Sequence, residues 1–185
     1  MSGHSKWAQI KYKKALTDAK KGKIFSKLSR FITIAAKDPP AGGGPDPKTN
    51  YKLASAIEDA KAANMPQENI SRAMDRAKEK DASQLKEVLY EVYGPSGSAL
   101  IITTVTDNSN RTINEIKMIL SENGAKLGEQ GSAMWAFDRR SLGEGGYIPK
   151  FPMALSEEDN KKLENLLSAL DDQDDVQEVY TNTSS

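Results

Sequence analysis

Three features are scarce or missing in this chain of 185 residues, and each shortage excludes a class of function. Cysteine is absent, so disulfides, thiolate metal sites and cysteine nucleophiles are excluded. The single histidine, His4, leaves a transition-metal site dependent mainly on carboxylates, which is improbable chemistry for these metals. No apolar run approaches the roughly 18 residues that a membrane helix needs. We therefore expect no metal, no other cofactor and no membrane partner.

The first residues also lack targeting features. They contain no apolar segment of the kind that a secretory signal peptide requires. They are rich in lysine and contain little arginine, which is a poor fit to a transit peptide. Together with the absence of cysteine, these features favour a cytoplasmic protein.

Charge is balanced over the whole chain but not along it. Lysine plus arginine and aspartate plus glutamate each total 26, so the formal net charge is zero. Residues 1–37 nevertheless hold ten basic residues and one acid, whereas residues 155–185 hold nine acids and two lysines. A basic segment on a neutral chain indicates a surface that binds polyanions.

Apolar residues recur at helical spacing over residues 24–36 and predict an amphipathic helix. At about 100° per residue, the opposite face of this helix carries Lys20, Lys23, Lys27 and Arg30. The run Asp38-Pro39-Pro40 ends the helix. Further helices are predicted over residues 48–63 and from Pro66 onward, so residues 1–80 form a three-helix unit.

Beyond residue 80 the hydrophobic period changes from 3.6 to 2, which is typical of strands. Two further helices are predicted, one ended by Asn123-Gly124 and one capped by Ser156. The predicted extended segments are residues 88–93, 99–105, 134–137, 147–155 and 176–180. We therefore predict an α+β fold, in which an N-terminal three-helix domain (residues 1–80) precedes an α/β sandwich (residues 81–185) with a mainly antiparallel sheet and helices on one face.

The strongest functional signal is the basic N-terminal segment. Several lysines on one surface suit phosphate binding, because each neutralised phosphate releases a condensed counterion. Trp7 and Tyr12 lie among these lysines and would stack on bases or anchor the segment. The predicted nucleic-acid-binding residues are Lys6, Trp7, Lys11, Tyr12, Lys13, Lys14, Lys20, Lys21, Lys23, Lys27 and Arg30. This pattern does not separate DNA from RNA, and because residues 1–21 offer few core positions, we expect the fold to tolerate their removal.

Two other polar clusters have alternative interpretations. At the start of a predicted helix, Asn110, Arg111 and Thr112 offer a secondary phosphate contact, although a capping box from Thr112 to Glu115 explains the same residues. The acidic run at residues 171–175 lacks the glycine and distal glutamate of an EF-hand loop. We interpret this run as a solvated acidic turn that contacts a basic partner.

The sequence shows no serine–histidine–aspartate set, no phosphate-binding loop and no paired-carboxylate signature. We therefore expect a protein that is not an enzyme and has no small-molecule substrate. The leading hypothesis is a nucleic-acid-binding regulator that uses its basic segment. The alternative is a protein-interaction module whose acidic C-terminal helix docks a basic partner.

Several motifs occur in the order found in one protein family. Near the N-terminus they are Gly3-His4-Ser5-Lys6-Trp7 and Lys20-Lys21-Gly22-Lys23-Ile24-Phe25-Ser26-Lys27-Leu28. Further on they include Gly42-Gly43-Gly44-Pro45-Asp46-Pro47, Tyr90-Glu91-Val92-Tyr93-Gly94-Pro95, Gly128-x-x-Gly131-Ser132 and Asp174-Asp175-Val176-Gln177-Glu178-Val179-Tyr180. With these motifs the chain closely resembles the YebC/PmpR family over nearly its whole length.

This resemblance implies a cytoplasmic protein with a helical N-terminal domain, α/β domains behind it and no catalytic site. Members are widely described as DNA-binding transcriptional regulators. Others, including the mitochondrial translational activator of cytochrome oxidase subunit I, act on translation, and some bacterial members work at the ribosome on stalled proline-rich synthesis. The resemblance thus implies a DNA-binding transcriptional regulator, with a ribosome-associated translation factor that binds ribosomal RNA as the alternative.

The chain departs from the family pattern at one place. Members usually carry a further α/β domain after the segment that matches residues 134–137, whereas here residues 139–147 form a short linker. We therefore predict that the inserted third domain is absent and that the remaining strands still close one sheet.

Overall fold

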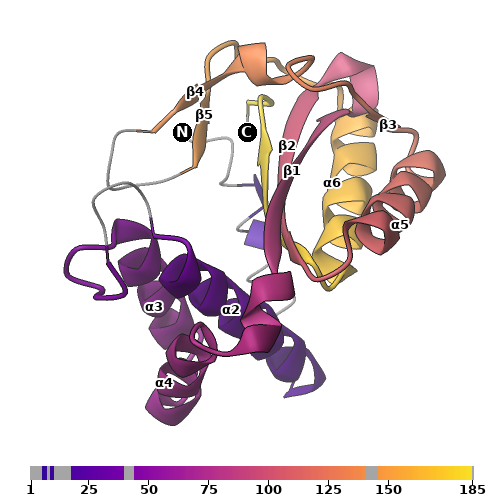
Figure 1. Cartoon of the computed structure of the whole chain (residues 1–185). Helices are drawn as coiled ribbons and strands as arrows, with labels where there is room; N and C mark the ends of the chain where they lie inside the picture. Colours follow the sequence, from indigo (N-terminus) through magenta and orange to yellow (C-terminus); the bar gives the residue numbers. More distant parts are fainter. Residues whose placement is uncertain (1–5, 8, 11–17, 40–43, 141–145, 185) are drawn as a thin grey trace.

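The computed structural model describes residues 6–7, 9–10, 18–39, 44–140 and 146–184. A bundle of helices lies beside a twisted four-stranded sheet, and two further helices cover one face of that sheet (Figure 1). Among the helices in these residues, none is long and apolar enough to cross a membrane.

The bundle consists of three helices, α2 (Asp18–Lys37), α3 (Tyr51–Ala62) and α4 (Gln67–Arg76). Their apolar faces meet in a core whose buried residues include Leu28, Ile32, Leu53, Ala56 and Ile70. These positions recur at intervals of three and four along each helix, as an amphipathic helix requires.

Asn50 connects two helices of the bundle. Its side-chain oxygen accepts a hydrogen bond from the backbone N–H of Leu53 at 3.0 Å and so caps the start of α3. Its amide group donates to the carbonyl of Ala35 at 2.7 Å, near the end of α2. One buried side chain therefore fixes where α3 begins relative to α2.

The sheet is antiparallel throughout, with the strand order β3-β1-β2-β6. Two helices cover one of its faces, and short 3-10 turns connect several of the elements. The elements are η1 (Lys80–Gln84), β1 (Lys86–Tyr93), η2 (Pro95–Gly97), β2 (Ala99–Thr106), α5 (Ser109–Glu122), β3 (Lys126–Leu127), η3 (Met134–Ala136), β4 (Phe137–Arg139), β5 (Tyr147–Pro149), α6 (Glu157–Asp172) and β6 (Val176–Thr181).

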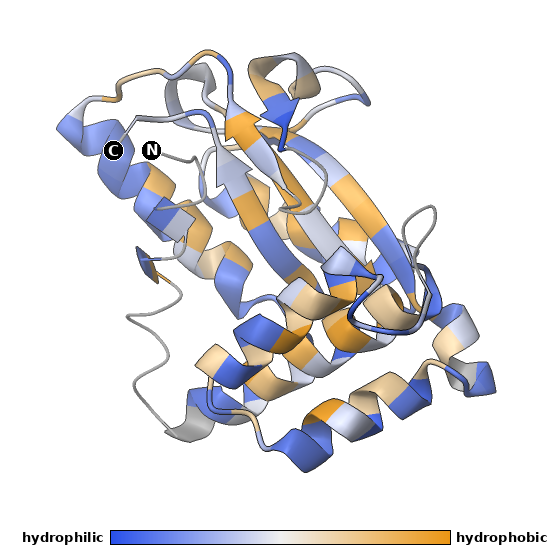
Figure 2. Ribbon diagram, turned by 90° about the vertical axis from the view of Figure 1, so that its left-hand side faces the viewer, coloured by the Kyte–Doolittle hydropathy of each residue, from blue (hydrophilic) through white to orange (hydrophobic). Residues whose placement is uncertain are grey.

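Successive residues of β2 point to opposite faces of the sheet. Leu100 and Ile102 join the core beneath α5 and α6. Ala99 and Ile101 join a second, smaller core beneath η3, β4 and β5. Both faces of this central strand are buried, and Figure 2 shows the alternation of hydrophobic and hydrophilic residues along neighbouring strands.

The second face of the sheet carries a buried carboxylate, Glu91 of β1. It accepts hydrogen bonds from the backbone N–H groups of Gly131 at 2.5 Å, Ala133 at 2.7 Å and Met134 at 2.7 Å. Three donors satisfy a charge that would otherwise be costly to bury. Glu91 therefore ties the loop before β4 to the sheet.

The structure confirms the predicted α+β fold, with a mainly antiparallel sheet and helices on one face. It differs at several places. The strands β4 and β5 pair with each other in a separate two-stranded sheet, so the prediction that the remaining strands close one sheet is wrong. The predicted extended segment 147–155 forms a strand only over Tyr147–Pro149. Residues 134–136 form a 3-10 turn, and the strand begins only at Phe137. The short strand β3 was not predicted, because two residues are too few to show a period. The division into domains at residue 80 stays a prediction.

Trp7 corrects the expectation that residues 1–21 contribute little to the core. Its side chain is fully buried and packs in the main core with Leu163, Leu167 and other residues of α6 and the sheet. Ile10 packs against the same core. The N-terminal segment is therefore anchored on the α+β part of the molecule, and its removal would open that core.

Candidate nucleic-acid interface

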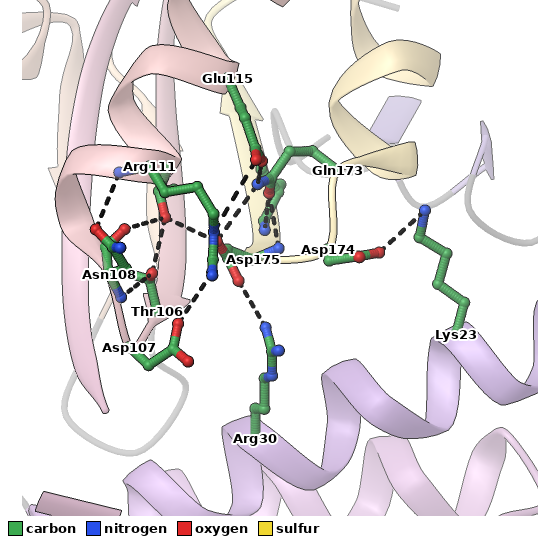
Figure 3. Close-up of polar contacts among 12 residues, drawn as sticks. Lys23, Arg30, Thr106, Asp107, Asn108, Arg111, Glu115, Gln173, Asp174 and Asp175 are labelled. Carbon is green, nitrogen blue, oxygen red and sulfur yellow. Dashed lines mark hydrogen bonds and ion pairs between the residues drawn. The ribbon is translucent and has the colours of Figure 1, made fainter. Parts of the chain in front are cut away.

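The basic face of α2 lies against the acidic segment at the C-terminal end of α6. We call residues 171–175 the acidic turn. Lys23 forms an ion pair with Asp174 at 3.1 Å, and the Lys27 ammonium lies 4.0 Å from the carboxylate of Asp171 (the Lys23 pair is drawn in Figure 3). The two oppositely charged ends of the chain thus neutralise one another.

The lysines also bind the backbone at the end of α6. The Lys27 ammonium donates to the carbonyl of Asp171 at 2.5 Å, and that of Lys23 donates to the carbonyl of Asp172. The last carbonyls of a helix have no partner within the helix and carry partial negative charge. Cations from α2 therefore offset the unfavourable placement of acids at this helix end.

Asp175 is the centre of the contact. Its side chain is 1% exposed, and its carboxylate forms ion pairs with Arg30 of α2 at 2.6 Å and with Arg111 of α5 at 3.0 Å (Figure 3). The hydroxyl of Thr112 donates to it at 2.7 Å. Burial opposes ionisation, but the bonds from Thr112 and Arg111 and the charges of Arg111 and Arg30 hold the pKa of Asp175 below its usual value.

Gln173 shapes the turn that presents Asp175. It follows the last residue of α6 in an extended conformation. Its side-chain oxygen accepts from the backbone N–H groups of Asp175 at 2.7 Å and Val176 at 2.8 Å. This arrangement directs the chain from α6 into β6 and turns the Asp175 carboxylate toward α2 and α5.

The acidic turn was interpreted as solvated and as contacting a basic partner. In the structure the basic surface that this turn contacts is α2 of the same chain. The expectation of solvation is wrong for Asp175, which three elements enclose. Residues far apart in the sequence meet here, so the local pattern could not show the burial.

The secondary phosphate contact predicted at the start of α5 stays a prediction, and its three residues have different environments. Helix α5 begins at Ser109, and its N-cap is Asn108, which accepts from the N–H of Arg111 at 3.1 Å. Thr112 is buried, and its hydroxyl is bound within the protein. The Arg111 side chain bonds Asp107 and Asp175 and is 42% exposed, and Asn110 is exposed too.

The remaining predicted binding residues have different environments. Lys6 contacts Asn160 at 2.6 Å and Glu164 at 3.8 Å on α6, and Trp7 anchors the segment rather than presenting a ring to a ligand. Lys20 and Lys21 are exposed at the N-terminal end of α2. Four more lie outside the described residues, namely Lys11, Tyr12, Lys13 and Lys14.

A second basic surface lies outside the predicted segment. Arg72 and Arg76 stand one turn apart on α4 and line a groove that Arg30 of α2 also borders. No charge pattern in the sequence indicates this surface, because acids alternate with bases along α4 and leave no net charge. Only the packing of α4 on α2 places these arginines beside a third one.

Comparison with known proteins identifies the group to which the chain belongs. A model described as the TACO1/YebC protein N-terminal domain matches residues 5–80. A model described as the TACO1/YebC second and third domain matches residues 85–145 and 141–183.

The chain belongs to the TACO1/YebC family. The resemblance seen in its motifs is thereby confirmed. A probable transcriptional regulatory protein of Caldanaerobacter subterraneus is 40% identical over 98% of both chains. Another of that description, from Solibacter usitatus, is 51% identical over 76% of this chain and 55% of its own. A crystal structure of a conserved hypothetical protein from Aquifex aeolicus has a TM-score of 0.76 and 32% identity, covering 90% of this chain and 91% of its own.

This TACO1/YebC protein is shorter than such relatives. The alignment with the Caldanaerobacter protein spans 241 positions, more than the length of the chain. The two pieces matched by the second family model meet at residues 141–145, which the structure does not describe. Loss of an inserted domain at this point stays a prediction.

Motifs that carry the family resemblance have structural roles in this TACO1/YebC protein. Glu91 holds the loop before β4, and Asp175 joins α2, α5 and β6. Gly128 lies so close to Ser132 that a Cβ atom there would be 2.3 Å from the serine hydroxyl. These residues therefore hold elements together, and a ligand is not needed to account for them.

Proposed function

We propose that this protein is a non-enzymatic regulator of gene expression that binds nucleic acid. The proposal is supported by its membership of a family whose relatives are named probable transcriptional regulatory proteins. The structural observation that carries it is the exposed pair Lys20 and Lys21, which follows Lys11, Lys13 and Lys14 after five intervening residues in the sequence. A cytoplasmic location stays a prediction.

The contacts between α2 and the acidic turn reduce the number of basic side chains that can contact phosphates. Lys23, Lys27 and Arg30 already face carboxylates of the acidic turn. Lys20 and Lys21 are more exposed than these three residues, and we propose that they make the first contact together with the basic residues preceding them. The acidic turn has its basic partner within the chain, which weakens the case for a protein-interaction module that docks through it.

DNA is the ligand favoured by the names of the relatives, which point to control of transcription. Ribosomal RNA is the alternative, with a role in translation at stalled proline-rich sequences. One observation favours it: α2 offers lysines, which contact the phosphate backbone as point charges, and little of the bidentate chemistry that reads bases in the major groove.

The test is titration of a fluorescent DNA duplex and a folded ribosomal RNA fragment with the native protein at several salt concentrations. We expect log affinity to fall linearly with log salt. The variant Lys20→Ala/Lys21→Ala loses two phosphate contacts, so its slope is expected to flatten by about 2 units. The control is Lys117→Ala/Lys126→Ala, which removes two exposed lysines of α5 and β3. Absence of binding to either ligand, or binding independent of salt, contradicts the proposal.

Sedimentation of cell extract on a sucrose gradient separates the two ligands. Migration with ribosomes that is lost at high salt favours translation. Migration as a free protein, together with protection of a defined promoter, favours transcription.

A further inference from the structure

A groove runs between α2 and α4 and is closed at one side by residues 79–85. Its volume is about 740 Å³, within the range of clefts that hold whole small ligands. The α2 side presents Ser26, Ser29 and Arg30, and the α4 side presents Asn69, Arg72 and Arg76. Each set recurs at intervals of three and four, so one face of each helix forms a wall. We call this hollow the arginine groove.

The side chains of the arginine groove are those that contact nucleic-acid backbones. Arginine, serine and asparagine are among the side chains that donate hydrogen bonds to phosphate and sugar oxygens. The groove also contains two acids, Glu79 and Asp107. Asp107 is already paired with Arg111 at 3.0 Å, so the three guanidinium groups dominate the charge that a ligand would meet.

The arginines retain donors that a ligand can use. Arg30 donates through one terminal nitrogen to Asp175, and Arg72 through one to Glu68 at 2.7 Å. A guanidinium group carries several further N–H donors, so these pairs do not exhaust it. Within the described part of the chain, Arg76 has no carboxylate oxygen within 4.0 Å.

Arg30 is held in place before any ligand arrives. Asp175, the partner of its guanidinium group, is 1% exposed and is itself fixed by Arg111 and Thr112. An immobilised guanidinium group loses little conformational entropy when it binds a phosphate. The contact between α2 and the acidic turn therefore also orients one wall of the arginine groove.

The shape of the arginine groove favours a single strand over a duplex. The groove contains the half-buried ring of Phe25 and the apolar side chains of Ala73 and Leu85. Proteins that bind single strands combine a basic groove for the backbone with an aromatic surface for the bases. In a duplex the base faces are stacked on one another and cannot reach such a surface.

We propose that the arginine groove binds a single-stranded segment of nucleic acid, with Arg30, Arg72 and Arg76 on its phosphates and Phe25 against a base. This inference rests on the proposed function, because it takes nucleic acid as the ligand. It adds a second surface to the exposed lysines of α2 and specifies the strandedness of the ligand.

The experiment measures fluorescence anisotropy of labelled oligouridine and oligothymidine of about 12 nucleotides and of a duplex of equal length. The native protein is compared with Arg72→Ala/Arg76→Ala and with the control Lys117→Ala/Lys126→Ala, which loses the same charge elsewhere. All four substituted residues are exposed, and melting temperatures verify that the folds are equal. We expect the arginine variant to bind single strands about tenfold more weakly. Its salt slope is expected to fall by about 1.4, with duplex binding little changed.

Each outcome bears on a different statement. Unchanged single-strand binding by the arginine variant, with weaker binding by Lys20→Ala/Lys21→Ala, overturns the groove and leaves the proposed function standing. If the native protein binds none of the three oligonucleotides, the proposed function fails as well. Equal affinity for the two single strands indicates recognition of the backbone and base faces, whereas preference for oligouridine identifies RNA as the ligand.

Discussion

The basic residues of α2 fall into two groups that differ in how far their side chains are exposed. Lys23, Lys27 and Arg30 face the acidic turn of their own chain, whereas Lys20 and Lys21 are exposed one turn earlier in the helix. The first group joins the helical bundle to the α+β part of the molecule. A run of equal charges in a sequence therefore does not measure the capacity to bind a polyanion, because those charges can already be paired within the folded chain.

The largest effect is expected from the anchor of the N-terminal segment. Trp7→Ala removes a fully buried side chain, and we expect the free energy of unfolding to fall by about 3–5 kcal/mol. Urea denaturation measures this loss. The control is Trp135→Ala, because Trp135 is 58% exposed and its loss is expected to cost below about 1 kcal/mol. Equal losses in the two variants contradict the anchoring role.

The next effect concerns the centre of the charged contact. Asp175→Ala leaves Arg30 and Arg111 without their shared carboxylate, and we expect a loss of about 3 kcal/mol in the free energy of unfolding. Its neighbour Asp174 is the matched control, because the Asp174 side chain is 72% exposed and pairs only at the surface with Lys23. Asp174→Ala is expected to cost at most about 1 kcal/mol by the same measurement.

The dependence of stability on acidic pH is a second test of the role of Asp175. The pKa of Asp175 is lowered in the folded protein, so its contribution is present above the unfolded pKa of about 3.9. That contribution is lost as pH falls through the lower, folded value. Asp175→Asn removes the titration, so denaturation midpoints measured from about pH 5 downward should fall less steeply in this variant. Parallel curves for the two proteins would show that Asp175 is not perturbed.

The smallest effect distinguishes the two groups of α2 lysines. Lys27→Ala removes the donor to the carbonyl of Asp171 and is expected to lower the free energy of unfolding by about 1 kcal/mol. Lys20→Ala changes an exposed side chain and is expected to stay within about 0.5 kcal/mol of the native value. Thermal unfolding of the two variants side by side tests the difference. A loss of similar size in both would mean that the two groups are not distinct.

Much of the fold could be read from local patterns. The 3.6-residue period over α2 and the period of 2 over β1 and β2 identified these elements, and Ser156 caps α6 as predicted. Capping was harder, because Asn108 and Thr112 are both good N-cap residues four positions apart. The structure selects Asn108, since the hydroxyl of Thr112 is committed to the buried carboxylate of Asp175.

The candidate site could be predicted less well than the fold. A single tryptophan within a polar segment has no period, so nothing in the sequence around Trp7 showed its burial. Arg72 and Arg76 lie on a helix with balanced charge, so no local pattern indicates a basic surface there. Both omissions have one cause, because burial and shared surfaces depend on which elements pack together.

Local sequence patterns account for the type and order of most elements, the basic face of α2 and the acidity of residues 171–175. These properties arise from interactions between residues within a few positions of one another. The contact between the basic face of α2 and the acidic turn depends on the tertiary structure. Lys23, Lys27 and Arg30 are separated in the sequence from their partners in this turn by 149, 144 and 145 positions. Such contacts form when the apolar faces of the bundle and the sheet are buried. The way these elements pack then determines which charged side chains pair and which stay exposed to solvent.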